Sequence, residues 1–335
     1  MSRSPRLKED AHFIYNITDI DKVSRNLGIP WETSKDQLFM PSTTYIGFVW
    51  NLEQHTVTLS PSKTDKYINK IRKWLDRRAH TLKHVQELYG KLLHAASIMP
   101  QGHAYLVGLE SMLGTCAKRH FVPHCPDNGL DKDLLWWVKK LNSGAVIRLI
   151  HTPPTFLNPG AFSDASSSIG IDITIGNRWC AWCLWAGWQS LHRPKDIGWA
   201  EAIAFELLVC TLDNILPSTN HVILHVDNTG VVEGWRVGRH RNCVVNTIFK
   251  HVHTFINAAT RVRSIATHYI PSSDNTADEP SRGVYGSERL LLPAIPLPEH
   301  LRDFLTDATE PLSARELREL KEGRYLTNAT RVFNE

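Results

Sequence analysis

The sequence predicts an α/β domain in its C-terminal half, preceded by a helical domain. Residues 161–285 alternate strand-like and helix-like runs in the order β-β-β-α-β-α-α-β, which is typical of a sheet covered by helices. Residues 61–142 instead carry apolar residues at helical spacing, separated by turn signals. A chain of 335 residues with 42% hydrophobic residues has room for both domains, each with a core of its own.

The N-terminal part is expected to contain a hairpin followed by helices. In residues 44–60, apolar and β-branched residues flank a polar turn at Asn51–His55, which predicts two paired strands. Helices are expected at 19–27, from Ser60 or Ser62 to about Arg78, from Thr81 to about Leu93, after Gln101-Gly102, and at 130–142. The divisions predicted for this part are residues 1–60, a helical domain at 61–142 and a Pro-rich linker at 143–160.

The α/β domain is expected at 161–285 and a tail at 286–335, with a weak helix at 312–323. Three strands are predicted within 161–187, with turns at Ser166–Ser168 and at Gly176-Asn177. The elements predicted after them are a helix at 197–214, a strand at 221–226, helices at 228–236 and 242–258, and a strand at 262–270.

Composition narrows the class of protein. The net charge of +4 permits nucleic-acid binding, and residues 62–93 concentrate nine Lys or Arg against three acids; this excess predicts either a solvated helical face or a surface that follows phosphates. Six scattered cysteines, including the lone pair Cys180 and Cys183 in an apolar run, favour free thiols in a reducing compartment. Neither a secretory leader nor a membrane span is expected, so we expect an intracellular protein, in the cytoplasm or the nucleus.

Four acidic residues occupy the ends of predicted elements. Asp164 lies in or just after the first strand, and Glu201 in the first turn of the next helix. Asp227 ends the fourth strand, and Asp278 opens the last element. Such positions on one side of an α/β sheet converge on a crevice. Because clustered carboxylates repel one another, the pattern predicts a site for two Mg²⁺ or Mn²⁺ ions, which prefer oxygen ligands.

Alternatives remain open at two of these positions. Each acid taken alone is more typical of a helix cap or a turn. Glu206 is an alternative to Glu201, since it lies on the same predicted helix but points in another direction. Asp274 and Glu279 are alternatives to Asp278.

Several spaced motifs resemble a known family. The segments SDASSSIGI (163–171), WAEAIAFEL (199–207), HVDNTGVVEGWRVGRHRN (225–242) and IPSSDNTADEPSRG (270–283) resemble the ribonuclease H domain of retrotransposon reverse transcriptases, especially fungal ones. Upstream, LGIPWETSKDQ, YIGFVWNLEQHTVTLS and LKHVQELYGKLLHAASIMPQGHAYL resemble the end of the palm, the primer-grip hairpin and the thumb of such enzymes. The resemblance covers about residues 20–285.

The resemblance implies a fold and an activity. The fold is a ribonuclease H-like mixed five-stranded sheet with flanking helices, preceded by a helical thumb-like domain with a β-hairpin. The activity is metal-dependent cleavage of the RNA strand of RNA–DNA hybrids. By the same resemblance, the metal-binding acids are Asp164, Glu201, Asp227 and Asp278, and residues 1–60 are a remnant of the palm.

Contacts with nucleic acid are expected at two places. The resemblance puts the primer grip at Tyr45, Ile46, Gly47 and Phe48, and polar residues near the substrate at Asn228 and Asn242. Basic and aromatic residues add candidates of their own, which are Lys70, Lys73, Trp235, Arg236, Arg239 and Arg241.

The sequence departs from the family in ways that limit its activity. It contains no Tyr-x-Asp-Asp, so polymerisation is not expected from this chain, which leaves room for a partner that supplies the palm and fingers. The SSDN of residues 272–275 stands where cellular enzymes carry a mobile His. Two other functions stay open at this stage, a catalytically inactive nucleic-acid-binding remnant of a retroelement and a purely structural subunit.

Overall fold

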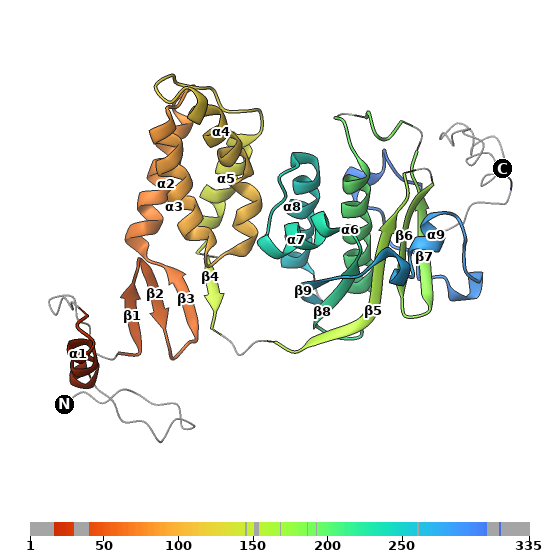
Figure 1. Ribbon diagram of the computed structural model, residues 1–335, viewed down its shortest axis with the longest axis horizontal. Helices are drawn as coiled ribbons and strands as arrows, with labels where there is room; N and C mark the ends of the chain where they lie inside the picture. The colour runs from red at the N-terminus through yellow and green to blue at the C-terminus, as the bar shows by residue number, and fades with distance from the viewer. Residues whose placement is uncertain are drawn as a thin grey trace. The chain divides into compact units, whose positions relative to one another are not determined.

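The chain folds into two compact units, which are described separately (Figure 1). The computed structural model describes residues 17–29, 40–144, 146–150, 154–167, 169–185, 187–191, 193–259, 261–306 and 315. The N-terminal unit comprises Met1–Met99 and Thr115–Thr152, and the C-terminal unit comprises Pro100–Gly114 and Pro153–Glu335. The helical domain predicted at 61–142 is therefore interrupted. Residues 100–114 belong to the C-terminal unit, where the Asn246 side chain donates a hydrogen bond to the Ala104 carbonyl (2.7 Å).

A four-stranded antiparallel sheet lies at one end of the N-terminal unit. Its strands, in spatial order, are β1 (Ser42–Tyr45), β2 (Phe48–Asn51), β3 (Thr56–Leu59) and β4 (Ile147–Leu149). The predicted hairpin is confirmed by the pairing of β2 with β3. A tight turn joins β1 to β2, and its residues Ile46 and Gly47 both have positive φ, as a type I′ turn requires. The presence of β4 shows that the predicted linker at 143–160 is wrong in part.

Helices complete the N-terminal unit. They are α1 (Ile17–Asn26), α2 (Pro61–Leu75), α3 (Leu82–Ala96), α5 (Leu130–Asn142) and the C-terminal part of α4 (Val107–Lys118). Pro61 is favoured at the first position of α2, because it has no N–H to leave unpaired. Ile71 of α2, Leu88 of α3 and Trp137 of α5 are fully buried, so the apolar face of each predicted helix faces the core of this unit.

The C-terminal unit is built on a five-stranded sheet. Its strands are β5 (Phe156–Ala165), β6 (Gly170–Ile175), β7 (Arg178–Cys183), β8 (Asn220–Val226) and β9 (Val262–Tyr269). The spatial order is β7-β6-β5-β8-β9, with antiparallel pairing from β7 to β5 and parallel pairing from β5 to β9. The sheet is therefore mixed, and the predicted order of elements is confirmed. β5 begins inside the predicted linker, and its register with β8 shifts between Leu157 and Ala161.

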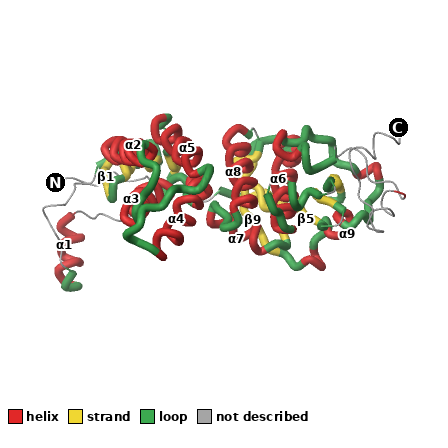
Figure 2. The backbone as a smooth tube through the Cα atoms, turned by 90° about the horizontal axis from the view of Figure 1, so that it is seen from above, coloured by secondary structure: helices red, strands yellow, loops and turns green. Residues whose placement is uncertain are grey.

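Helices cover this sheet. They are α6 (Ile197–Ile215), α7 (Thr229–Val237), α8 (Cys243–Ala258) and the short α9 (Asp278–Ser281). Figure 2 shows α6 and α8 side by side along the sheet. Nearly every residue of α6 between Trp199 and Leu212 is buried, because neighbours surround this helix. Among the helices of the described residues, none is both long and apolar enough to cross a lipid bilayer.

The segment predicted as a tail is part of the core as far as the structure describes it. Leu301, Phe304 and Leu305 are buried in the same apolar cluster as α6. The Leu292 N–H donates to the Trp179 carbonyl of β7 (2.8 Å), and the Thr306 N–H donates to the Cys183 carbonyl (3.0 Å). The prediction of a tail over 286–335 is thus wrong for residues 286–306. The helix predicted at 312–323 lies outside the described residues except for residue 315.

Gly170 tests how tightly the sheet is packed. A Cβ atom at this position of β6 would lie 2.0 Å from the Trp182 carbonyl oxygen, so the backbone must shift to accept one. We predict that Gly170→Ala lowers the free energy of unfolding of the C-terminal unit by about 3 kcal/mol, measured by urea denaturation.

Gly90→Ala is the matched control for this prediction. A Cβ atom at Gly90, within α3, meets nothing within 4 Å. Alanine is the better helix former, so Gly90→Ala should stabilise the N-terminal unit by ~0.5–1 kcal/mol. Wild-type stability in Gly170→Ala would contradict the close approach of β6 and β7.

Candidate acidic metal centre

Three of the four predicted acids gather at one edge of the five-stranded sheet. Asp164 lies near the end of β5, Asp227 directly follows β8, and Glu201 lies on α6. One carboxylate oxygen from each lies within 4.8 Å of one from each of the others. Glu201 is the fifth residue of α6, so the prediction that it lies in the first turn of that helix is wrong by a residue.

The parallel pairing of β5 with β8 explains this convergence. Ser163 of β5 pairs with Val226 of β8, so the next residue along each of these two strands, Asp164 near the end of β5 and Asp227 just after β8, lies at the same edge of the sheet. The carboxyl ends of parallel strands are the usual ligand-binding edge of α/β proteins. α6 packs against β5 and brings Glu201 to the same place.

Burial and mutual repulsion make the carboxyl groups of Glu201 and Asp164 reluctant to ionise. Burial, together with the charges of Asp164 and Asp227, raises the pKa of Glu201 to about 9. Burial also raises the pKa of Asp164 to about 6, against the effect of the Ser281 hydroxyl, which donates a hydrogen bond to Asp164 Oδ2 (2.5 Å). A bound cation would reverse this balance, since it favours the ionised form of each group.

Several oxygens of this centre have no hydrogen-bond partner within the described part of the chain. Glu201 Oε2 and Asp227 Oδ1 are both buried and unpartnered. Buried polar atoms are normally paired, and each exception indicates a function, a bound water or an ion. The donors here are all oxygens, which suits Mg²⁺ or Mn²⁺. The residues present therefore fit such a metal.

Asp172 lies next to Asp164 of this centre, a neighbour that the sequence analysis missed. It pairs directly with Asp164 across β5 and β6, is fully buried, and leaves both carboxylate oxygens unpartnered among the described residues. Burial and then the charge of Asp164 raise its pKa well above the usual range. One signal could have found it, an acidic residue inside the apolar strand GIDITI.

Asp278 stands apart from the three gathered acids. It begins α9 and is held by Arg282, whose Nη2 lies 2.7 Å from Asp278 Oδ1 and whose Nε lies 3.0 Å from Oδ2. It is still close enough for its charge to raise the pKa of both Asp164 and Glu201. The alternatives Asp274 and Glu279 are exposed. Asp278 thus remains the best candidate for the fourth acid.

Glu206, the alternative to Glu201, lies in a different place. Its Oε2 lies 3.0 Å from His300 Nε2, and it groups with His251 and His300 rather than with Asp164. The two glutamates of α6 therefore serve two separate clusters.

The residues expected to contact nucleic acid differ in exposure within the N-terminal unit. Tyr45 and Lys73 are exposed. Phe48 is buried instead, with its ring stacked on His94 at a centroid distance of 4.3 Å, and its place in a primer grip stays a prediction. Gly47 provides the turn described above, and Lys70 forms an ion pair with Glu87.

Packing or capping also explains most of the candidates in the C-terminal unit. Asn228 and Asn242 cap α7 and α8 by accepting hydrogen bonds from backbone N–H groups. Trp235 is half-buried, packs on His253 and donates to the Ile265 carbonyl (3.2 Å), and its contact with nucleic acid stays a prediction. The three arginines differ, since Arg236 pairs with Glu233, Arg239 pairs with Glu110, and Arg241 is exposed.

Comparison of the sequence with known families and proteins identifies no relative. The chain matches no family model, and no curated protein matches it.

Proposed function

We propose that the C-terminal unit is a metal-dependent endonuclease of the ribonuclease H type, which cleaves the RNA strand of RNA–DNA hybrids. The convergence of Asp164, Glu201 and Asp227 at the carboxyl ends of β5 and β8 carries the proposal. The sheet order β7-β6-β5-β8-β9 and the motifs that resemble retrotransposon ribonuclease H domains support it.

The proposal assigns metal binding to the four acids and an orienting role to Ser281. Asp164, Glu201, Asp227 and Asp278 would hold two Mg²⁺ or Mn²⁺ ions, which at a phosphodiester lower the pKa of the attacking water and stabilise the leaving oxygen. A bound cation would favour the ionised form of Glu201, whose pKa is raised by burial and by the charges of Asp164 and Asp227. Ser281 orients Asp164 through the hydrogen bond to Oδ2.

The decisive experiment uses the whole chain and a labelled RNA–DNA hybrid. With Mg²⁺ we expect cuts confined to the RNA strand, leaving 5′-phosphate ends, and no cuts in excess chelator. Single-stranded RNA and duplex DNA serve as control substrates. A folded protein that binds the hybrid but leaves it intact with both Mg²⁺ and Mn²⁺ would overturn the proposal in favour of an inactive nucleic-acid-binding protein.

Arg282 should compete with metal for Asp278. The two side chains form a partly exposed ion pair, and such pairs contribute ~0.3–1 kcal/mol. We predict that Arg282→Ala lowers the Mg²⁺ concentration for half-maximal cleavage by about two- to fivefold, measured in a metal titration. Arg289→Ala, which removes another exposed arginine, should leave it unchanged. A higher Mg²⁺ requirement in Arg282→Ala would show that Arg282 assists the site.

A further inference from the structure

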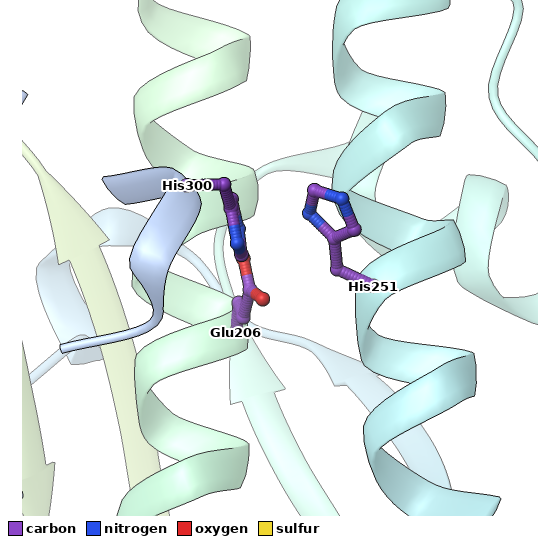
Figure 3. Close-up of side chains that lie close together, drawn as sticks. All are labelled: Glu206, His251 and His300. Atoms are coloured by element: carbon purple, nitrogen blue, oxygen red, sulfur yellow. The ribbon is translucent and has the colours of Figure 1, made fainter. Parts of the chain in front are cut away.

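A second cluster of metal-ligand side chains lies in the C-terminal unit, away from the acidic centre. Glu206 comes from α6, His251 from α8, and His300 from the short helix η5 (Glu299–Leu301). One ligand atom from each lies within 4.8 Å of one from each of the others. Figure 3 shows the three side chains converging from their separate elements. The cluster shares no residue with the acidic centre.

The Glu206 carboxylate of this cluster is buried in apolar surroundings, where an ionised group needs a compensating charge or hydrogen bonds. Glu206 is 3% exposed and lies on a helix whose other buried residues are almost all apolar. His300 Nε2 lies 3.0 Å from Glu206 Oε2 and provides one contact. A buried ionised carboxylate is stable only when a cation or several hydrogen bonds compensate it.

The third side chain, His251, has a ring nitrogen without a hydrogen-bond partner in the described residues, next to Glu206 and His300. His251 Nδ1 is buried and has no hydrogen-bond partner in the described part of the chain. A ring nitrogen of His251 faces His300 and Glu206 in Figure 3, and the two imidazole rings lie 3.7 Å apart between centroids. Burial, then the neighbouring His300, lowers the pKa of His251 to about 4. A neutral imidazole ring is the form of histidine that binds metals.

We propose that Glu206, His251 and His300 bind a Zn²⁺ ion, which fastens the C-terminal segment 286–306 to α6 and α8. Two imidazole nitrogens and one carboxylate are a common protein ligand set for Zn²⁺, with water in the fourth position. The acidic centre offers oxygens alone and suits Mg²⁺ or Mn²⁺. The two centres therefore differ in their metal preference.

The position of the three ligands in the chain indicates a structural role. The ligands are separated by 45 and 49 residues, from 251−206 and 300−251, so one ion joins three distant points. His300 is next to Leu301, which is fully buried in the core cluster. Such an ion contributes its binding free energy to folding. The site should therefore hold the C-terminal segment in place without taking part in hybrid cleavage.

Zinc titration of the chelator-treated whole chain tests the proposal. By calorimetry we expect one Zn²⁺ to bind with a micromolar or lower Kd and the thermal midpoint to rise. His251→Ala and His300→Ala should each weaken binding at least ~10-fold, because even the loss of a side chain that only supports a ligand typically costs that much. X-ray absorption at the zinc edge should show nitrogen and oxygen neighbours without sulfur.

A second pair of histidines supplies the matched control. The Nδ1 atoms of His225 and His268 lie 3.3 Å apart on β8 and β9, so His225→Ala removes a paired histidine elsewhere on the same unit. It should leave zinc affinity unchanged. Zinc binding that survives both His251→Ala and His300→Ala would overturn the proposal, and so would the absence of binding to the wild type.

The test is independent of the proposed nuclease function. Asp227→Asn changes the acidic centre alone, so this variant should retain the zinc site. Zinc binding without hybrid cleavage in the wild type would refute the nuclease and leave the zinc site standing, and the reverse result would refute the zinc site alone.

Discussion

Asp227→Asn should abolish hybrid cleavage, with a loss of at least ~10²–10³-fold in kcat, as expected when a group that stabilises transition-state charge is removed. The reason lies in the position of Asp227, directly after β8 and beside Asp164. Asparagine keeps the shape but removes the charge that a cation needs. Gel analysis of a labelled hybrid under single-turnover conditions measures the loss.

An exposed neighbouring acid separates this effect from general electrostatics. Asp274 lies on the turn before α9 and is exposed, so Asp274→Asn removes one charge close by without altering the buried centre. It should cleave at nearly the wild-type rate. If Asp227→Asn retained full activity while folded, the acidic centre would not be the active site.

Glu201→Gln should stabilise the metal-free protein at high pH and inactivate it. The pKa of Glu201 is about 9 in the folded chain and near 4.5 when unperturbed. Because the folded value is the higher one, the contribution of Glu201 to stability is complete below pH 4.5 and declines as the pH rises toward 9. Glutamine has no proton to lose. At pH 9 the variant should exceed the wild type by at least ~1 kcal/mol, or about 2–4 °C in thermal midpoint.

Two controls use the dependence on pH and on metal of the stability difference between Glu201→Gln and the wild type. At pH 4 the two proteins should melt at similar temperatures, since Glu201 is then protonated in both the folded and unfolded states. Adding Mg²⁺ at pH 9 should raise the midpoint of the wild type more than that of the variant. Calorimetric melting with and without chelator makes the measurement. A metal-free variant less stable than the wild type at pH 9 would contradict the raised pKa.

Local pattern was sufficient to predict most of the fold. The five strands of the C-terminal unit and its helices α6, α7 and α8 follow from alternation and helical spacing, and capping side chains such as Asn228 and Asn242 mark where helices begin. The segment 286–306 was misjudged because its leucines stand among prolines without a regular period. Such residues are buried by tertiary packing, which no local pattern reports.

The candidate site was predictable to the extent that it depends on strand ends. Asp164 and Asp227 follow from the pairing of parallel strands. Asp172 does not, because its role depends on the register between β5 and β6. The packing of Phe48 on His94 and of Trp235 on His253 does not follow from local pattern either. An aromatic side chain suits either a core or a stacking surface, and tertiary contacts decide between them.

The docking of the C-terminal segment on β7 has a consequence for self-association. β7 is the last strand on its side of the sheet, and an uncovered last strand is a template onto which another molecule can add a strand. Backbone hydrogen bonds from Leu292 and Thr306 occupy the carbonyls of Trp179 and Cys183 near the two ends of β7. The chain thus protects its own sheet from aggregation, and a fragment ending at residue 285 would lose that protection.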